Sequence, residues 1–276
     1  MRSLAQQDVA EMGGRWSVLS RQKADHVELD RLLGCLAEAP PSGQPAVLLR
    51  IYRLVFPHAF AEEAVLWPAI RRVLPDGQEL TLRVEQEHQQ INQLVTRLEA
   101  LEPGTPDHAD VLARVVDLLR ADVRDEEDLL LPRLQEKLSP AQLRSLGFAW
   151  EAVKRIAPTR AHPVVARRPP GNVLSALPLT ILDRSRDHVE AALHRGRHAR
   201  RALTKAGDAL ARTSRAVENL PGMDRGEDPS THIPRRRSPW GVIALVAVAG
   251  AAVGAGLRAQ RGGTARRPTE HAKEVR

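Results

Sequence analysis

Histidine and carboxylate residues occur in this 276-residue sequence at spacings that suit a metal site. His58 and Glu62 are four residues apart, and so are Asp122 and Glu126. On a helix, residues at this spacing stand on one face, so each pair can point into the protein interior together. Imidazole and carboxylate donors without a thiolate suit iron, manganese or zinc, and helical bundles hold paired metals in this way. Two further histidines complete a set of six candidate metal ligands: His26, His58, Glu62, His88, Asp122 and Glu126.

An internal repeat places these candidate ligands in two equivalent copies. Shifted by 64 residues, segment 58–68 aligns with segment 122–132 in the pattern (His/Asp)-x-x-x-Glu-Glu-x-x-Leu-x-Pro. Shifted by 62 residues, Asp25-His26 aligns with Glu87-His88. One helical hairpin of about 60 residues therefore occurs twice. Each copy has an acidic residue and a histidine on its first helix and a pair of possible ligands on its second.

Each of these residues also has an ordinary structural interpretation. A lone histidine is more often packed or exposed than bound to metal, and adjacent glutamates on a helix are usually solvated. The repeat favours metal binding, because chance would not match the ligand positions of both hairpins in register with their Leu and Pro positions. Glu63 and Glu127 lie one position from the expected ligand face, so we expect them to be solvated or to support the ligands.

The elements that must carry these residues are helices. Apolar residues recur at helical spacing through the first half, and Pro- and Gly-rich breakers separate the segments. The one cysteine, Cys35, excludes an internal disulfide framework and a cysteine-based zinc site. We expect an all-α, antiparallel four-helix bundle with a short fifth helix in residues 1–157. The expected helices are Val18–Glu38, Ala46–Leu74, Gln78–Leu101, Ala109–Lys137 and Pro140–Ile156, with kinks or ends at Pro68 and Pro132.

The second half of the sequence has a different charge balance. Residues 1–150 contain 17 Lys and Arg against 23 Asp and Glu, whereas residues 151–276 contain 24 against 11. Composition divides this basic half into five parts. They are a linker (158–178), a basic amphipathic helix (179–220), a second linker (221–237), a transmembrane helix (238–257) and a disordered basic tail (258–276).

The predicted transmembrane helix follows from an uncharged run that begins near Trp240. Its 18 residues from Trp240 to Leu257 would span about 27 Å, close to the hydrocarbon thickness of a bilayer. A buried helix is the alternative. The polar start of the chain does not resemble a signal peptide, so we expect a single-pass protein of the cell membrane with its bundle in the cytoplasm.

The basic helix over 179–220 has nine Lys and Arg between Arg184 and Arg215. Such a segment beside a membrane is attracted to anionic lipid head groups. Nucleic acid is a rival partner, but aromatic residues for base stacking and a docking motif are both missing from this stretch. No nucleic-acid partner is therefore expected, and the sequence predicts no oligomeric state.

Over about residues 20–135 the sequence resembles the hemerythrin-like HHE cation-binding family. The resemblance rests on Asp25-His26, His58-x-x-x-Glu62-Glu63, Glu87-His88 and Glu126-Glu127 with its Leu-x-Pro. It implies an antiparallel four-helix bundle that holds a carboxylate-bridged, non-haem di-iron centre. The implied ligands are His26, His58, Glu62, His88 and Glu126.

Position 122 departs from the family pattern, which usually has histidine where this chain has Asp122. An aspartate can still bind a metal, but its negative charge should favour the oxidised ion. A single-metal or degraded site is the alternative to a di-iron centre, and manganese or zinc are alternatives to iron.

The resemblance implies several activities without choosing among them. Members of the family bind oxygen reversibly, sense oxygen or nitric oxide, store iron or handle peroxide. The leading hypothesis is a membrane-tethered di-iron protein that binds or senses O₂, NO or peroxide, or handles iron. The alternatives are an interaction module with a degraded metal site and a metal-dependent, peroxide-decomposing enzyme. Metal and oxygen binding is favoured over enzymatic activity.

Overall fold

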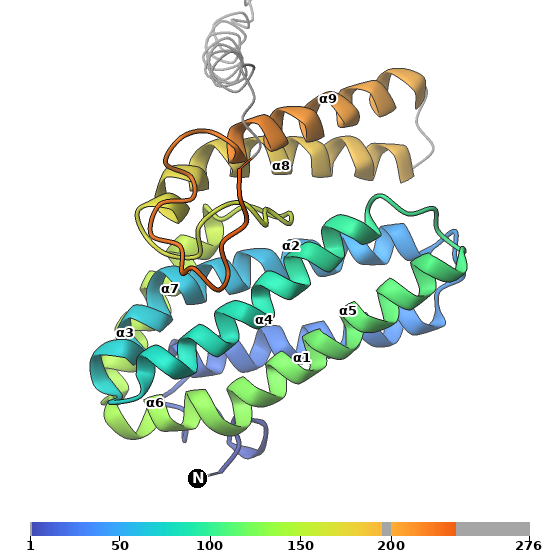
Figure 1. The fold of residues 1–276 in the computed structure, drawn as a ribbon. Coiled ribbons are helices and arrows are strands. Elements are labelled where there is room, and N and C mark those ends of the chain that lie inside the picture. Colours follow the sequence, from blue (N-terminus) through green and yellow to red (C-terminus); the bar gives the residue numbers. More distant parts are fainter. Residues whose placement is uncertain (1, 195–199, 236–276) are drawn as a thin grey trace, which may run out of the picture.

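The computed structural model describes residues 2–194 and 200–235, and all regular structure in these ranges is helical (Figure 1). The predicted all-α class is therefore confirmed for the described part of the chain. Two helical hairpins form the bundle, and the same hairpins were recognised as the sequence repeat. The first contains α1 (Val18–Glu38), α2 (Gln44–Ala61), the turn η2 (Glu62–Leu66) and α3 (Trp67–Val73). The second contains α4 (Gly77–Leu98), α5 (Pro106–Asp125), the turn η3 (Glu126–Leu130) and α6 (Leu131–Lys137).

The turns η2 and η3 are π-helical, and they occupy equivalent places in the two hairpins. The backbone N–H of Trp67 donates to the carbonyl of Glu62, five residues back, and Leu131 repeats this contact with Glu126. Pro68 and Pro132 follow directly. We expected these prolines to kink or end their helices, but each helix continues as α3 or α6 after one wide turn. Such π-turns inside α-helices often mark functional sites.

Two apolar clusters fill the bundle, and a polar layer lies between them along each long helical segment. On α1, Val18 belongs to one cluster and Leu29 to the other, with the buried polar residues Gln22 and His26 between them. Along the chain, α4 has the same order, whereas the antiparallel segments α2–α3 and α5–α6 run through the two clusters in reverse. The clusters supply the apolar burial that stabilises the fold, and the layer between them collects the candidate ligands.

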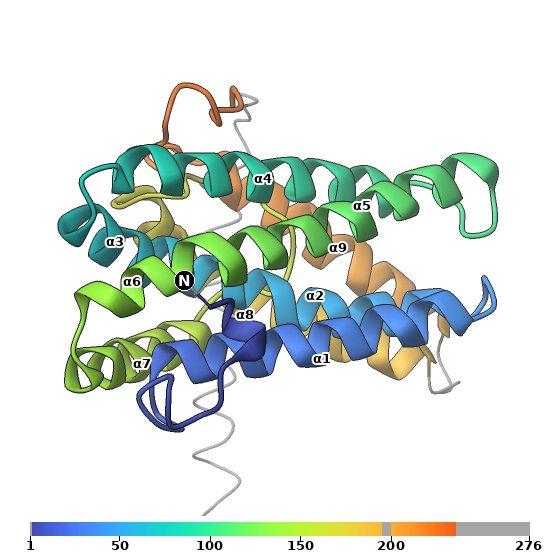
Figure 2. The same cartoon turned by 90° about the horizontal axis from the view of Figure 1, so that it is seen from below.

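A fifth helix, α7 (Pro140–Arg155), packs against α1 and α2, as Figure 2 shows from below. It begins with a capping box in which Ser139 and Gln142 satisfy each other's backbone N–H groups. Trp150 of this helix is buried in the first apolar cluster. The predicted short fifth helix is thus present and closes one side of the bundle.

The region after α7 differs from the single basic helix expected over 179–220. It contains two antiparallel helices, α8 (Gly171–His194) and α9 (Arg200–Glu218), which pack on each other beside the bundle (Figure 1). The segment expected as a linker over 158–178 includes the first turns of α8, and much of its remainder is buried. Gly171 is required here, because an added Cβ would lie 2.5 Å from the carbonyl oxygen of Met223.

In residues 2–194 and 200–235, no helix combines the length and the apolar character needed to cross a bilayer. The predicted transmembrane helix (238–257) and basic tail (258–276) lie outside the described residues.

Candidate metal centre

All six candidate ligands lie in the polar layer, where they form two adjacent groups. His26 and His58 form one group with Glu126, and Glu62 and His88 form the other with the same Glu126. Within each group, one ligand atom from each residue lies within 4.8 Å of the others. Glu126 is common to both groups, so it is placed to bridge two cations.

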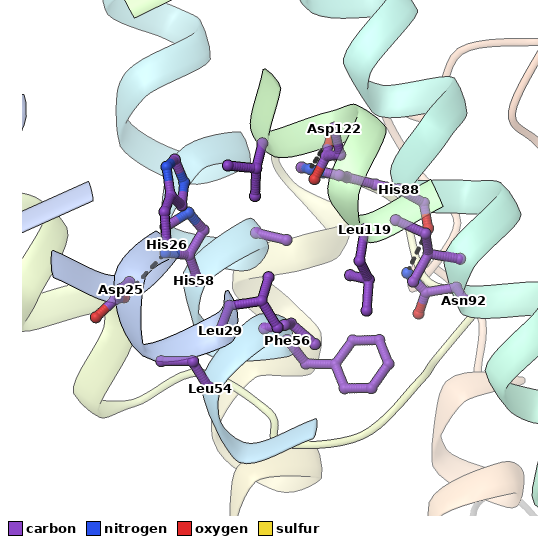
Figure 3. A pocket seen from close by; sticks show the side chains of 14 residues that line it. Asp25, His26, Leu29, Leu54, Phe56, His58, His88, Asn92, Leu119 and Asp122 are labelled. Atoms are coloured by element: carbon purple, nitrogen blue, oxygen red, sulfur yellow. Dashed lines mark hydrogen bonds and ion pairs between the residues drawn. The ribbon is translucent and has the colours of Figure 1, made fainter. Parts of the chain in front are cut away.

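The sixth candidate, Asp122, lies at the second group. Its Oδ1 is 3.6 Å from Nε2 of His88. Figure 3 shows Asp122 beside His88 on one side of a pocket and His26 with His58 on the other. The first group therefore contains two imidazoles, whereas the second contains one imidazole and an additional carboxylate.

Glu62 offers one oxygen to each group. Its Oε1 lies 3.1 Å from Nε2 of His58, and its Oε2 lies 3.7 Å from Nε2 of His88. The side-chain amide of Gln22 donates to the same Oε1 at 2.7 Å. Gln22 is not recognisable from the sequence, because the equivalent position in the second hairpin is Val84 and the repeat gives no signal there.

A carboxylate lies behind each of the three histidines. Nδ1 of His26 is 2.8 Å from Glu127, Nδ1 of His58 is 2.9 Å from Asp25, and Nδ1 of His88 is 3.0 Å from Glu63. Each contact turns the ring so that Nε2 faces the centre, as is usual for metal-binding histidines. Glu63 and Glu127 are both buried rather than solvated, so the supporting role is the one that the geometry gives them.

Several polar atoms that face the centre have no hydrogen-bond partner among the described residues. Leaving a buried polar atom unsatisfied costs about 1–3 kcal/mol, and more if the group is charged. Cations at this position would satisfy all of these atoms, so the residues present fit a metal centre. The atoms are Nε2 of His26 and His88, Oε2 of Glu62, Oε1 of Glu126 and Oδ1 of Asp122.

Protons balance the clustered carboxylates in the metal-free protein. Burial lowers the pKa of His26, but the adjacent carboxylates of Glu126 and Glu127 outweigh it and raise the pKa to about 9. For His58, burial is likewise outweighed by the charge of Glu62, and the pKa rises to about 10. Burial and the nearby charge of Glu62 raise the pKa of Glu126 to about 8. Because metal ligands must be deprotonated, metal binding here would release these protons.

An apolar pocket opens beside the two groups (Figure 3). Its cavity volume is about 30 Å³, which suits a molecule of one or two heavy atoms. The candidate ligands that border it are His26, His58, His88 and Asp122. The apolar part of its wall is formed by Leu29, Leu54, Val55, Phe56, Ala59, Ile91, Leu119 and Val123.

Comparison with known proteins agrees with this geometry. Residues 17–134 match the model of the hemerythrin HHE cation binding domain family. The sequence is 24% identical over 134 residues to an uncharacterized hemerythrin-like protein of Schizosaccharomyces pombe, covering 48% of this chain and 66% of that protein. It is 29% identical over 105 residues to a DNA nickase of Nostoc sp., covering 38% of this chain and 29% of that protein. No solved structure matched.

The alignment spans less than two thirds of either relative, so it characterises the bundle and not the whole protein. The bundle is a hemerythrin-like HHE cation-binding domain with His and Glu groups positioned for a metal. Such domains typically bind iron.

Proposed function

We propose that this protein holds a pair of non-haem iron ions and uses them to bind or sense O₂, nitric oxide or peroxide. The observation that carries the proposal is the pair of ligand groups joined by Glu126, with buried donor atoms that a cation would satisfy. Mixed imidazole and carboxylate donors without thiolate suit iron. Iron bound here would supply the redox chemistry and the open coordination position that a diatomic ligand needs.

The two metal positions would differ in their ligands. His26 and His58 would hold the first ion, and His88 with Asp122 would hold the second. Glu62 and Glu126 would bridge them. The second position has more negative charge around it, which favours a more highly charged, oxidised ion.

The pocket beside the groups supports binding of a small molecule. Its apolar wall would exclude bulk water from the metal pair, and its volume of about 30 Å³ matches a diatomic molecule.

Iron loading under anaerobic conditions tests the proposal. We expect about two iron ions per chain by mass spectrometry, and a change in the visible spectrum when O₂ or NO is added. The double variant Glu62→Gln, Glu126→Gln should bind almost no iron, because both bridging groups are lost. The matched control is Glu79→Gln, Glu136→Gln, which alters two exposed glutamates of the same bundle. A wild-type protein without bound iron, or a double variant that binds as much as the control, would contradict the proposal.

We also propose that the protein works at a membrane surface. The solvent face of α8 has four large apolar side chains that are between 45% and 63% exposed: Val173, Leu174, Leu177 and Ile181. Ile156, itself exposed, lies near this helix, because Thr180 of α8 hydrogen-bonds to its carbonyl oxygen.

Basic residues surround this α8 patch, as an anionic lipid surface requires. Arg184 follows the patch on the same helix and donates to the carbonyl of Arg155, and both arginines are exposed. At the other end, Leu174 and Arg225 lie on either side of Gly222, each within 4 Å of where a Cβ on that glycine would stand. An apolar patch bordered by arginines is attracted to anionic lipids, whereas two copies packed on this patch would bring like charges together.

Co-sedimentation of the full chain with vesicles tests this second proposal. Phosphatidylserine-containing vesicles should bind the wild type, and the variant Leu174→Ser, Leu177→Ser should bind about tenfold more weakly. Its control is Val9→Ser, Val27→Ser, which removes two exposed apolar side chains elsewhere. Equal binding by both variants would contradict a role for the α8 patch.

A further inference from the structure

Two positively charged side chains, from outside the range that matches the family, lie next to the carboxylates that contact Nδ1 of two of the three histidines. Lys154 of α7 contacts Oδ2 of Asp25, the carboxylate that supports His58. Nη1 of Arg167 lies 3.7 Å from Oε1 of Glu63, the carboxylate that supports His88. Both cations therefore act on the side of the imidazole that faces away from the metal centre.

His26, the third histidine, has no such positively charged side chain near its supporting carboxylate in the described ranges. Glu127 contacts Nδ1 of His26, and in the described ranges no Lys or Arg side chain forms an ion pair with it. The three histidines thus differ in the charge behind them, although the repeated hairpins give them equivalent places in the bundle. This difference originates in α7 and the segment that follows it.

Arg167 is held firmly at this place. Its side chain is buried, its Nη2 contacts the side chain of Gln89, and its backbone N–H contacts Glu227. Its Nε has no hydrogen-bond partner among the described residues. A buried guanidinium fixed in this way cannot swing into solvent, so its charge acts constantly on Glu63.

We propose that Lys154 and Arg167 are positioning residues that weaken the carboxylate–histidine contacts and so lower the affinity of each metal position. The proposal rests on the metal centre proposed above. A carboxylate behind a metal-binding histidine increases the basicity of the ring and the strength of its bond to the metal. A cation beside that carboxylate opposes the effect. Arg167 would act on the position of His88, and Lys154 on the position of His58.

The test is the affinity of the protein for Zn²⁺, which is redox-inert, measured by competition with a chromophoric chelator. Arg167→Gln should bind one of two zinc ions about tenfold more tightly than the wild type, and Arg167→Lys should restore the wild-type value. Arg168→Gln is the matched control. Arg168 is the next residue, and it forms a 2.6 Å ion pair with the fully buried Glu85, whose other ion-pair partner is Arg71. This control should stay within about twofold of the wild type.

A second readout separates this effect from a general loss of structure. In the zinc-loaded protein, the proton NMR signal of Nδ1–H of His88 should move downfield in Arg167→Gln, while that of His26 stays in place. If Arg167→Gln does not fold, Lys154→Gln tests the same proposal at His58. If Arg167→Gln binds zinc no more tightly than Arg168→Gln does, this inference is wrong and the proposed metal centre is unaffected. A wild-type protein that binds no zinc overturns the proposed metal centre together with this inference.

Discussion

Oε2 of Glu126 lies 3.3 Å from Nε2 of His26, while its other oxygen, Oε1, is buried without a hydrogen-bond partner in the described part of the chain. Oε2 thus faces the first ligand group, and Oε1 is available to a cation bound at the second group. We expect the single variant Glu126→Gln to lose at least one of two metal ions. Metal analysis after dialysis against iron or zinc measures this loss.

The same variant should leave the metal-free protein about as stable as the wild type. Burial and the charge of Glu62 raise the pKa of Glu126 to about 8, so this group is already mostly neutral at pH 7. A glutamine side chain is also uncharged and has nearly the same size as a protonated glutamate. Urea unfolding of the metal-free proteins should therefore give free energies within about 1 kcal/mol. A much larger loss would mean that Glu126 is charged in the metal-free protein.

Asp122 should matter for one metal position only. Its carboxylate lies at His88 and takes no part in the group of His26 and His58. We expect Asp122→Ala to reduce the zinc content from about two ions to about one per chain. Asp117→Ala, on the preceding turns of α5, is the control. Retention of both ions would show that Asp122 is not a ligand, and loss of both would show that the two positions bind cooperatively.

His162 makes docking of the α8–α9 hairpin depend on pH. Burial lowers the pKa of His162, but the carboxylates of Asp183 and Glu218 outweigh it and raise the pKa from 6.5 to about 10. The contribution of His162 to the free energy of unfolding is therefore fully present below pH 6.5, and it is lost as the pH rises through 10. Between pH 7 and pH 10 the metal-free wild type should lose about 5 °C more in melting temperature than His162→Gln, which keeps only the pH dependence of the other buried histidines. Parallel pH profiles for the two proteins would contradict this assignment.

Glu85 should be essential for stability but not for metal binding. It is fully buried, and Arg71 and Arg168 each contact it at 2.6 Å. Glu85→Ala would leave two arginines without their buried partner, and breaking such a pair costs about 3–5 kcal/mol. Urea unfolding measures this cost. Metal content at low temperature should stay at the wild-type value, which distinguishes Glu85 from the ligands.

The sequence was sufficient to predict the bounds of α1 and to select six candidate ligands that lie together, because both depend on local periodicity and on the repeat. The observed bounds of α1, Val18–Glu38, are those expected, and α4 begins one residue early and ends three residues early. The wide turns at Glu62 and Glu126 could not be predicted, because they depend on bonds to the fifth residue back rather than on the helical period of 3.6 residues.

The region after residue 157 shows the other limit of sequence-based prediction. The Pro- and Arg-rich sequence of residues 167–171 is typical of a linker. Nevertheless, Arg167 and Arg168 each form an ion pair with a glutamate of the bundle. Such pairs join residues about 80 to 100 positions apart, and no local pattern identifies them. The burial of Glu63 could not be recognised for the same reason.

The polar layer between two apolar clusters has a consequence for the order of assembly. Each cluster draws on all four long segments, so the bundle can close around its centre before any cation arrives. Cations would then bind to ligands that the two clusters already hold in place. We therefore expect metal loading of the proposed centre to be separable from chain folding, so that metal supply after synthesis decides how many copies carry metal.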